Sequence, residues 1–199
     1  MRWGAICAAM GMVLSLSSVG PVAADLVFDS GHSTFDDSYP LAHEVWVINN
    51  AVLDVVGGEI VKLGTQNFAA VNLYGGTIES LRMGEAIGDK SVVNIWGGDI
   101  DRLRASDDTV VNLWAGAVNW VGAYENAVVN LYAYDVRLHF PAGHHDSGWL
   151  EGKFIIDDSY FRFAFGDPDP DTLSHINIVP EPATLMLLAL GGILLRKRG

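Results

Sequence analysis

The stretch Val71-Asn72-Leu73-Tyr74-Gly75-Gly76 contains the pattern from which the fold of this 199-residue chain can be predicted. Its copies are Leu53-Asp54-Val55-Val56-Gly57-Gly58, Val93-Asn94-Ile95-Trp96-Gly97-Gly98, Val111-Asn112-Leu113-Trp114-Ala115-Gly116 and Val129-Asn130-Leu131-Tyr132-Ala133-Tyr134. The Asp or Asn recurs in steps of 18, 22, 18 and 18 residues, and the longer step contains a four-residue insertion within residues 84–90. An aliphatic side chain follows six places after each one, at Ile60, Ile78, Ile100, Val118 and Val136. Self-similarity at a fixed period is typical of repeat architectures.

Each repeat has the composition of β-strands. β-branched and aromatic residues alternate with polar ones, and Gly-Gly pairs or turns such as Asp107-Asp108 bound each run. A repeat of 18 residues is too short for a propeller blade, which needs about 40, but it suits one coil of a solenoid whose strands pair about 4.8 Å apart. We therefore predict an all-β fold, a single-domain parallel β-solenoid (β-helix) of about five 18-residue coils over residues 52–140.

Alternation along the strands predicts which side chains face outward. If Val71, Leu73 and Ile78 point into the core, the residues between them point out, and stacking in register arranges them in columns. The polar column comprises Asp54, Asn72, Asn94, Asn112 and Asn130, whose amides can hydrogen-bond from coil to coil. The aromatic column comprises Val56, Tyr74, Trp96, Trp114 and Tyr132.

These two columns are the candidate binding site. Sugar rings can lie with their apolar C–H faces against aromatic rings while amides bind their hydroxyl groups. The possible glycan-binding residues are Tyr74, Trp96, Trp114, Tyr132, Asn72, Asn94, Asn112 and Asn130. The alternative is that the rings only stack on one another, since cross-strand aromatic pairs contribute about 0.2 to 1 kcal/mol each without a ligand.

The N-terminal 24 residues are typical of a secretory signal peptide. Arg2 precedes an apolar run over residues 6–16, and small residues precede a predicted cleavage after Ala24. Cys7, the single cysteine of the chain, lies in this segment, so we expect no disulfide in the mature protein. Residues 25–51 are the expected N-terminal cap. Residues 141–178 are the expected C-terminal cap and linker, with a β-hairpin formed by the apolar runs 149–156 and 160–165.

The C-terminal 21 residues have a different composition again. Val179 is followed by Pro180-Glu181-Pro182, an apolar run over residues 185–195, and the basic tail Arg196-Lys197-Arg198. The run is short for a transmembrane helix, which usually needs about 20 residues. The basic tail would stay cytoplasmic and leave the rest of the chain outside.

Residues 179–199 resemble the PEP-CTERM sorting signal of Gram-negative bacteria that make extracellular polysaccharide. The resemblance implies that an exosortase, a membrane transpeptidase, recognises the tail after signal peptidase has acted at the N-terminus. It implies a secreted, cell-surface or extracellular-matrix location, with only transient membrane contact through the sorting helix. The repeats also resemble, less specifically, those of secreted PEP-CTERM proteins and bacterial surface β-helices.

The charge of the chain narrows the class of partner. Lys and Arg number 12 against 24 Asp and Glu, a net charge of −12, which argues against nucleic acid because phosphate binding needs clustered cations. Loss of Arg2, Arg196, Lys197 and Arg198 would leave 8 cations (12 minus 4) against 24 acids, or about −16. Such a surface suits divalent cations or neutral glycans.

Two short segments are weaker candidates for metal binding. Gly143-His144-His145-Asp146 offers two imidazoles and a carboxylate, but adjacent histidines favour an exposed turn. Asp167-Pro168-Asp169-Pro170-Asp171 offers oxygen ligands for Ca²⁺, but lacks the glycine and glutamate of an EF-hand and favours a stiff linker. We expect no metal site and no cofactor, with Ca²⁺ binding as the alternative.

The sequence contains no motif that predicts catalysis. Glu79, Asp99 and Asp101 are interspersed with Arg102 and Arg104 in the pattern of a solvated face. No Ser-His-Asp order, phosphate loop or zinc motif is present. We predict a non-enzymatic surface or matrix protein with a structural or adhesive role. The alternatives are a polysaccharide-binding module and, beyond that, a carbohydrate-active β-helix enzyme.

Overall fold

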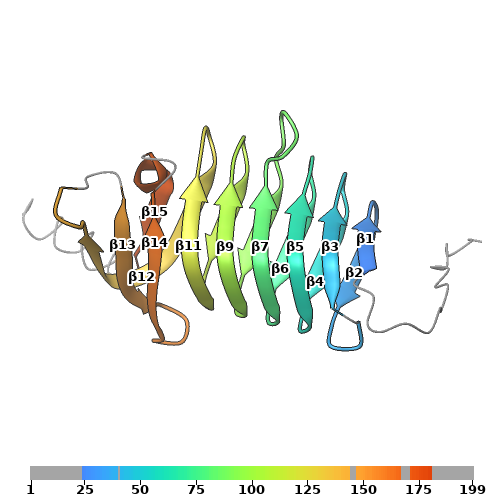
Figure 1. Cartoon of the computed structure of the whole chain (residues 1–199), viewed down its shortest axis with the longest axis horizontal. Coiled ribbons are helices and arrows are strands. Elements are labelled where there is room, and N and C mark those ends of the chain that lie inside the picture. The colour runs from blue at the N-terminus through green and yellow to red at the C-terminus, as the bar shows by residue number, and fades with distance from the viewer. Residues whose placement is uncertain (1–23, 40, 144–146, 167–170, 181–199) are drawn as a thin grey trace, which may run out of the picture.

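Each repeat of the chain folds into one coil that contains a short strand and a long strand. The computed structural model describes residues 24–39, 41–143, 147–166 and 171–180. Successive coils stack side by side along one axis, as Figure 1 shows, so equivalent strands form two parallel sheets. The predicted parallel β-solenoid is therefore confirmed, with about six turns where five were expected.

The strands of the two sheets alternate along the chain. The long-strand sheet contains β1 (Ala24–Phe28), β3 (Ala42–Val47), β5 (Glu59–Thr65), β7 (Thr77–Met83), β9 (Asp99–Ala105) and β11 (Ala117–Ala123). The short-strand sheet contains β2 (His32–Phe35), β4 (Val52–Val55), β6 (Ala70–Leu73), β8 (Val92–Ile95), β10 (Val110–Leu113) and the first part of β12 (Val128–His139). The sixth turn arises because β1 and β2 pair in parallel with β3 and β4, so the ladder begins in residues that we expected to form a cap.

The core consists of aliphatic columns that run the length of the solenoid. Val71, Leu73 and Ile78 are completely buried, as the alternation predicts, and so are their equivalents in the neighbouring coils. Burial of each such side chain contributes about 1.5 to 3 kcal/mol. In-register pairing of Val71 with Val93, and of Leu73 with Ile95, stacks like on like from coil to coil.

Glycine forms the corner that follows the short strands β4, β6, β8 and β10. Gly98 has φ +90°, and a Cβ on it would lie 3.0 Å from the carbonyl oxygen of Gly76 in the preceding coil. The opposite corner, after the long strands β3, β5, β9 and β11, uses Asn49, Asn67, Asp107 and Glu125 in the same left-handed region. Asn and Asp tolerate that conformation better than most residues, so both corners of the coil have a recognisable composition.

The insertion forms an enlarged loop between β7 and β8, seen in Figure 1 as the longest excursion from the coils. Asp89 is buried at its base, where its carboxylate accepts hydrogen bonds from the backbone N–H of Ser91 at 2.8 Å and of Gly84 at 3.1 Å. Burial raises the pKa of Asp89 in spite of these bonds. The carboxylate closes the loop, and the coil resumes in register at β8.

The solenoid ends where the glycine corner is missing. Ala133-Tyr134 replaces the Gly-Gly pair, and β12 continues past this point to His139 instead of turning, 12 residues in all. Val136 is therefore not the equivalent of Ile60 and Ile78, as the repeat offset predicted. It is only partly buried, beside a register shift between Tyr134 and Arg137 where β12 pairs antiparallel with β13.

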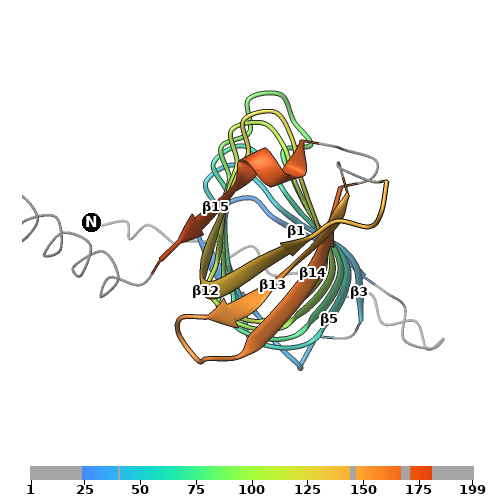
Figure 2. The same cartoon turned by 90° about the vertical axis from the view of Figure 1, so that its left-hand side faces the viewer.

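The far end is closed by an antiparallel hairpin and a final strand, as Figure 2 shows. β13 (Gly148–Phe154) and β14 (Tyr160–Phe165) form the hairpin, and β14 also pairs in parallel with β11. Phe154, Phe161, Phe163 and Phe165 are buried under it and close the core. The 3-10 helix η1 (Thr172–His175) and β15 (Ile176–Val179) then extend the short-strand sheet beside β12.

No helix within the described ranges is long and apolar enough to span a bilayer. The apolar run that we predict to form the transmembrane sorting helix lies outside them.

Candidate functional site

The polar column forms a continuous hydrogen-bonded ladder on the outside of the short-strand sheet. Each Asn donates through Nδ2 to the oxygen of the equivalent residue in the coil before it. The distances are 2.8 Å for Asn72 to Asp54 and 2.9 Å for Asn94 to Asn72, Asn112 to Asn94 and Asn130 to Asn112. Asn177 of β15 adds a further step, to Asn130 at 3.1 Å. The amides thus bind one another.

The direction of the ladder explains why its first member is an aspartate. Every Asn both donates and accepts, but Asp54 only accepts, from Asn72 Nδ2 and from His32 Nε2, each at 2.8 Å. A carboxylate is an acceptor-only group when ionised. The hydrogen bond from Asn72, followed by the contact with His32, holds the pKa of Asp54 below its usual value despite partial burial.

The aromatic column is stacked along the same axis. The ring centroids of Trp96 and Trp114 are 4.8 Å apart at an interplanar angle of 5°, and those of Trp114 and Tyr132 are 3.3 Å apart at 9°. Tyr74 and Trp96 have no ring contact with each other, and their exposed fractions are 51% and 37%. Trp114 therefore has both faces covered by neighbouring rings. At the N-terminal end of the column, the Tyr74 ring and one face of Trp96 are not covered by another ring of the column.

This stacking limits what the aromatic column can bind. A sugar ring packs its C–H groups against the face of an aromatic ring, since the face carries the negative quadrupole. From Trp96 to Tyr132 the faces meet each other, so ring edges point toward solvent. The flat platform expected from the sequence is thus reduced to Tyr74 and the uncovered side of Trp96.

A second set of outward-facing side chains, partly buried or exposed and not predicted as a site, lies on the outer face of the long-strand sheet. It contains Trp46, Trp120 and Trp149 together with most of the cations. The signal was present in the repeat: Lys62, Arg82, Arg102 and Arg104 lie eight or ten places after the Asp or Asn of their repeat. Because these offsets are all even, the four side chains lie on one face of the long strands, outside the six-residue motif that defines the repeat.

The remaining predicted residues lie at the ends of the chain or in its connections. Ala24 is the first residue of β1, and Pro180 directly follows β15. Residues 1–23, 144–146 and 167–170 lie outside the described ranges, as do Glu181, Pro182, Arg196, Lys197 and Arg198. In the part of the chain that the structure describes, no three His, Cys, Asp or Glu side chains are grouped to hold a metal ion.

Comparison with known proteins identifies the C-terminal segment. No curated protein and no solved structure matches the chain. The family model of the PEP-CTERM protein-sorting motif matches residues 179–198. Val179, the first matched residue, is also the last residue of β15 and pairs with Tyr132 of β12. The β-solenoid therefore ends where the motif begins.

These findings confirm the resemblance stated from the sequence: the chain carries a PEP-CTERM protein-sorting motif, the signal through which an exosortase recognises bacterial proteins that are secreted or displayed at the cell surface.

Proposed function

We propose that this protein is a non-enzymatic β-solenoid with a structural or adhesive role on the surface or in the extracellular matrix of a Gram-negative bacterium. The observation that supports the proposal is the self-contained outer face of the short-strand sheet. Its Asn amides bind the next coil, and Trp96, Trp114 and Tyr132 cover one another. Repeated exterior residues that serve coil-to-coil cohesion are what a stiff, surface-displayed rod requires.

The distribution of carboxylates favours a non-enzymatic role. The long-strand acids Glu79 and Asp99 are solvent-exposed, and Asp101 contacts Arg102 at 3.4 Å and accepts from Asn119 at 3.2 Å. Glycosidases instead hold a pair of carboxylates across a cleft at a defined separation. A screen of the purified protein for polysaccharide hydrolysis or lyase activity tests this, and turnover abolished by one or two carboxylate changes would overturn it.

The structural role is tested by the stability of aromatic-column variants. Trp114→Ala uncovers two ring faces and should lower the free energy of unfolding, whereas the exposed Tyr74→Ala should change it little. Deletion of the gene should weaken the cohesion of the cell-surface layer, and the Trp114→Ala variant should restore it poorly. Full restoration by a destabilised variant would contradict a structural role of the column.

A second candidate function, polysaccharide binding through the two columns, is favoured by the exposure of Tyr74 and Trp96. The test is co-sedimentation of the purified protein with the host's extracellular polysaccharide, with and without Ca²⁺. Under this alternative, Tyr74→Ala combined with Trp96→Ala abolishes binding in a folded protein. Unchanged binding would assign the polysaccharide to another surface.

Export through signal peptidase completes the proposal. Cleavage after Ala24 leaves Asp25 of β1 as the new N-terminus, at the start of the first coil. Mass spectrometry of the secreted protein should find that N-terminus, and a start more than a few residues away would contradict the assigned site.

A further inference from the structure

The cations of the described chain gather on one sheet. Eight Lys and Arg side chains lie between residues 24 and 180. Seven project from the long-strand sheet or its hairpin extension: Lys62, Arg82, Arg102, Arg104, Arg137, Lys153 and Arg162. The eighth, Lys90, lies in the insertion loop, and the described strands of the short-strand sheet have none before Tyr134. On this face the cations nearly balance the acids of the same strands, whereas the rest of the protein is strongly acidic.

Four of the eight cations form no ion pair within the described residues: Lys90 in the insertion loop and three arginines on the sheet. Lys62, Arg82, Arg102 and Lys153 each lie within 3.7 Å of a carboxylate oxygen. Within the described residues, Arg104, Arg137 and Arg162 form no ion pair, although acids outnumber cations two to one over the whole chain. The charge of Arg162 helps to lower the pKa of Glu151, but none of the three guanidinium groups forms an ion pair with a described carboxylate. Their N–H donors are therefore available for an external anion.

Aromatic rings hold two of these guanidinium groups in place. Arg104 donates through Nε to Tyr124 Oη at 3.0 Å and lies 4.8 Å from the centre of that ring. Arg162 lies 4.7 Å from the Trp149 ring, which stacks on His139 at 5.4 Å. Stacking fixes the plane of a guanidinium and leaves its N–H donors available for bidentate binding of a carboxylate.

The strand register arranges this face in two adjacent rows. Trp120 pairs with Ala164, Ala164 with Trp149, and Trp149 with His139, so the small Ala164 separates two indoles. Two residues away from this row along each strand, Arg162 pairs with Glu151, and Glu151 pairs with Arg137. Neighbouring strands are about 4.8 Å apart, close to the length of one hexose unit in a chain. An aromatic row (Trp120, Trp149 and His139) therefore runs beside a second row, called here the guanidinium row, in which Glu151 lies between Arg162 and Arg137.

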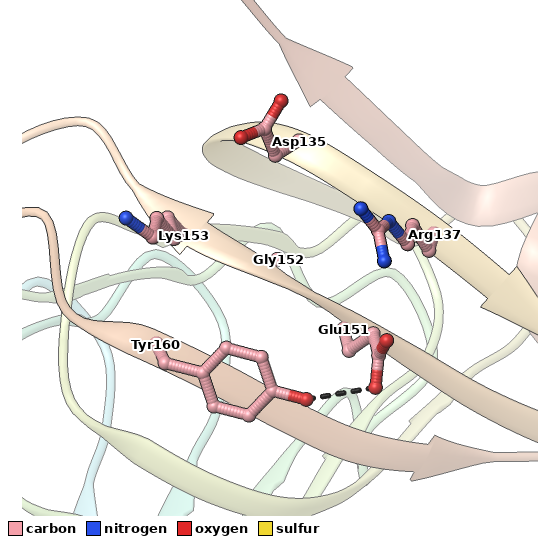
Figure 3. A pocket seen from close by; sticks show the side chains of 6 residues that line it. All are labelled: Asp135, Arg137, Glu151, Gly152, Lys153 and Tyr160. Atoms are coloured by element: carbon pink, nitrogen blue, oxygen red, sulfur yellow. Dashed lines mark hydrogen bonds between the residues drawn. The ribbon is translucent and has the colours of Figure 1, made fainter.

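A shallow depression of about 180 Å³ lies at the end of the guanidinium row. Figure 3 shows Arg137 beside Glu151 and the exposed ring of Tyr160 on the neighbouring strand. Tyr160 donates to Glu151 Oε2 at 2.7 Å, which lowers the pKa of Glu151 and raises that of Tyr160. The volume is below the range of about 300 to 1,000 Å³ typical of ligand pockets, so the depression suits one unit of a longer polymer.

We propose that this face, made by Arg104, Arg137, Arg162, Trp120, Trp149 and Tyr160, binds a carboxylate-bearing polysaccharide. Sparse carboxylates on the polymer meet the three guanidinium groups, and its sugar rings lie against Trp120 and the exposed ring of Tyr160. The Trp149 ring, which is covered by Arg162 and His139, holds Arg162 in place. The interleaved Glu151 and Asp135 would repel the dense charge of nucleic acid, which has one phosphate per about 1.7 Å of duplex. This inference rests on the proposed adhesive role, and it names a surface and a ligand charge that the sequence did not predict.

The test compares two triple variants with equal loss of charge. Arg104→Gln, Arg137→Gln and Arg162→Gln are combined in one protein, and Lys62→Gln, Arg82→Gln and Lys90→Gln in the other. Affinity electrophoresis in polygalacturonate, neutral dextran and duplex DNA measures binding, and unfolding midpoints verify that both variants fold. The parent should bind polygalacturonate but not dextran, with an affinity that falls as salt rises.

The first triple variant should lose about tenfold or more in affinity, since hydrogen bonds between a guanidinium and a carboxylate are roughly twice as strong as neutral ones. The second should change it by about threefold at most, the size of a screened surface-charge effect. If both variants lost affinity equally, net charge alone would explain the binding, and the proposed site would be wrong. Equal binding to DNA would overturn the glycan, and no binding to polygalacturonate would overturn both while leaving the structural role, tested by stability, unaffected.

Discussion

Asn112→Ala removes the middle of the hydrogen-bonded ladder and measures what the polar column contributes to the solenoid. Asn112 Nδ2 donates to Asn94 Oδ1, and Asn112 Oδ1 accepts from Asn130 Nδ2, each at 2.9 Å. A hydrogen bond contributes about 1 kcal/mol net, and a partner left unsatisfied and half-buried costs more. The expected loss is therefore about 2 to 3 kcal/mol in the free energy of unfolding.

Urea or thermal unfolding of the purified variant provides the measurement. For a domain of this size the loss corresponds to a decrease of roughly 5 to 10 °C in Tm. Asn119→Ala is the matched control, because Asn119 is exposed and makes one 3.2 Å hydrogen bond to the exposed Asp101. The control should lose less than about 0.5 kcal/mol. If the free energies of unfolding of the two variants differ by less than about 0.5 kcal/mol, the ladder does not stabilise the coils and the reasoning is wrong.

Three further predictions concern the corners, the acid limit and the aromatic column. Gly98→Ala should lower the free energy of unfolding by about 2 kcal/mol or more, because it combines positive-φ strain with a steric clash. Gly88→Ala, with φ +81° and open space around the new Cβ, should lower it only by the strain of about 1 kcal/mol. Equal losses in urea unfolding would refute the clash at Gly98. The lowered pKa of Asp54 means that its contribution is present above the ordinary value of 3.8 and is lost as pH falls through the folded-state pKa. In the Asp54→Asn variant the free energy of unfolding should therefore fall less steeply as pH decreases below about 3.8. The same pH dependence in the variant and the parent would contradict this. Trp114→Ala should cost about 3 kcal/mol or more and Tyr74→Ala under 1 kcal/mol by the same unfolding assay; similar costs would show that stacking contributes little.

The repeat pattern was enough to predict the coil because it repeats the physical requirements of the coil. Val71 and Leu73 alternate with outward residues, and a backbone period of two permits only one assignment of faces. The Asn ladder followed from in-register stacking of identical residues. The number of turns was underestimated because β2, with Ser33 where Leu53 stands in the next coil, does not share the motif although it pairs with β4.

The last repeat shows where sequence similarity misled. Val129-Asn130-Leu131-Tyr132 matches the motif, and its short strand is in register with β10. The missing glycine corner, at Ala133-Tyr134, prevents the turn, and Val136 leaves the core column. A repeat is therefore defined by its corner as much as by its apolar residues.

Local chemistry within one repeat determined the sheet type, the buried residues and the polar column, because each depends only on alternation and a fixed period. The C-terminal motif likewise identified the route out of the cell, since a sorting enzyme reads a linear segment. The tertiary structure alone decided that aromatic rings cover one another and that Arg104, Arg137 and Arg162 form no ion pair with the carboxylates of the described residues. Those properties depend on ring orientation and on distances between strands far apart in the chain, such as β9, β12 and β14, which no sequence period specifies.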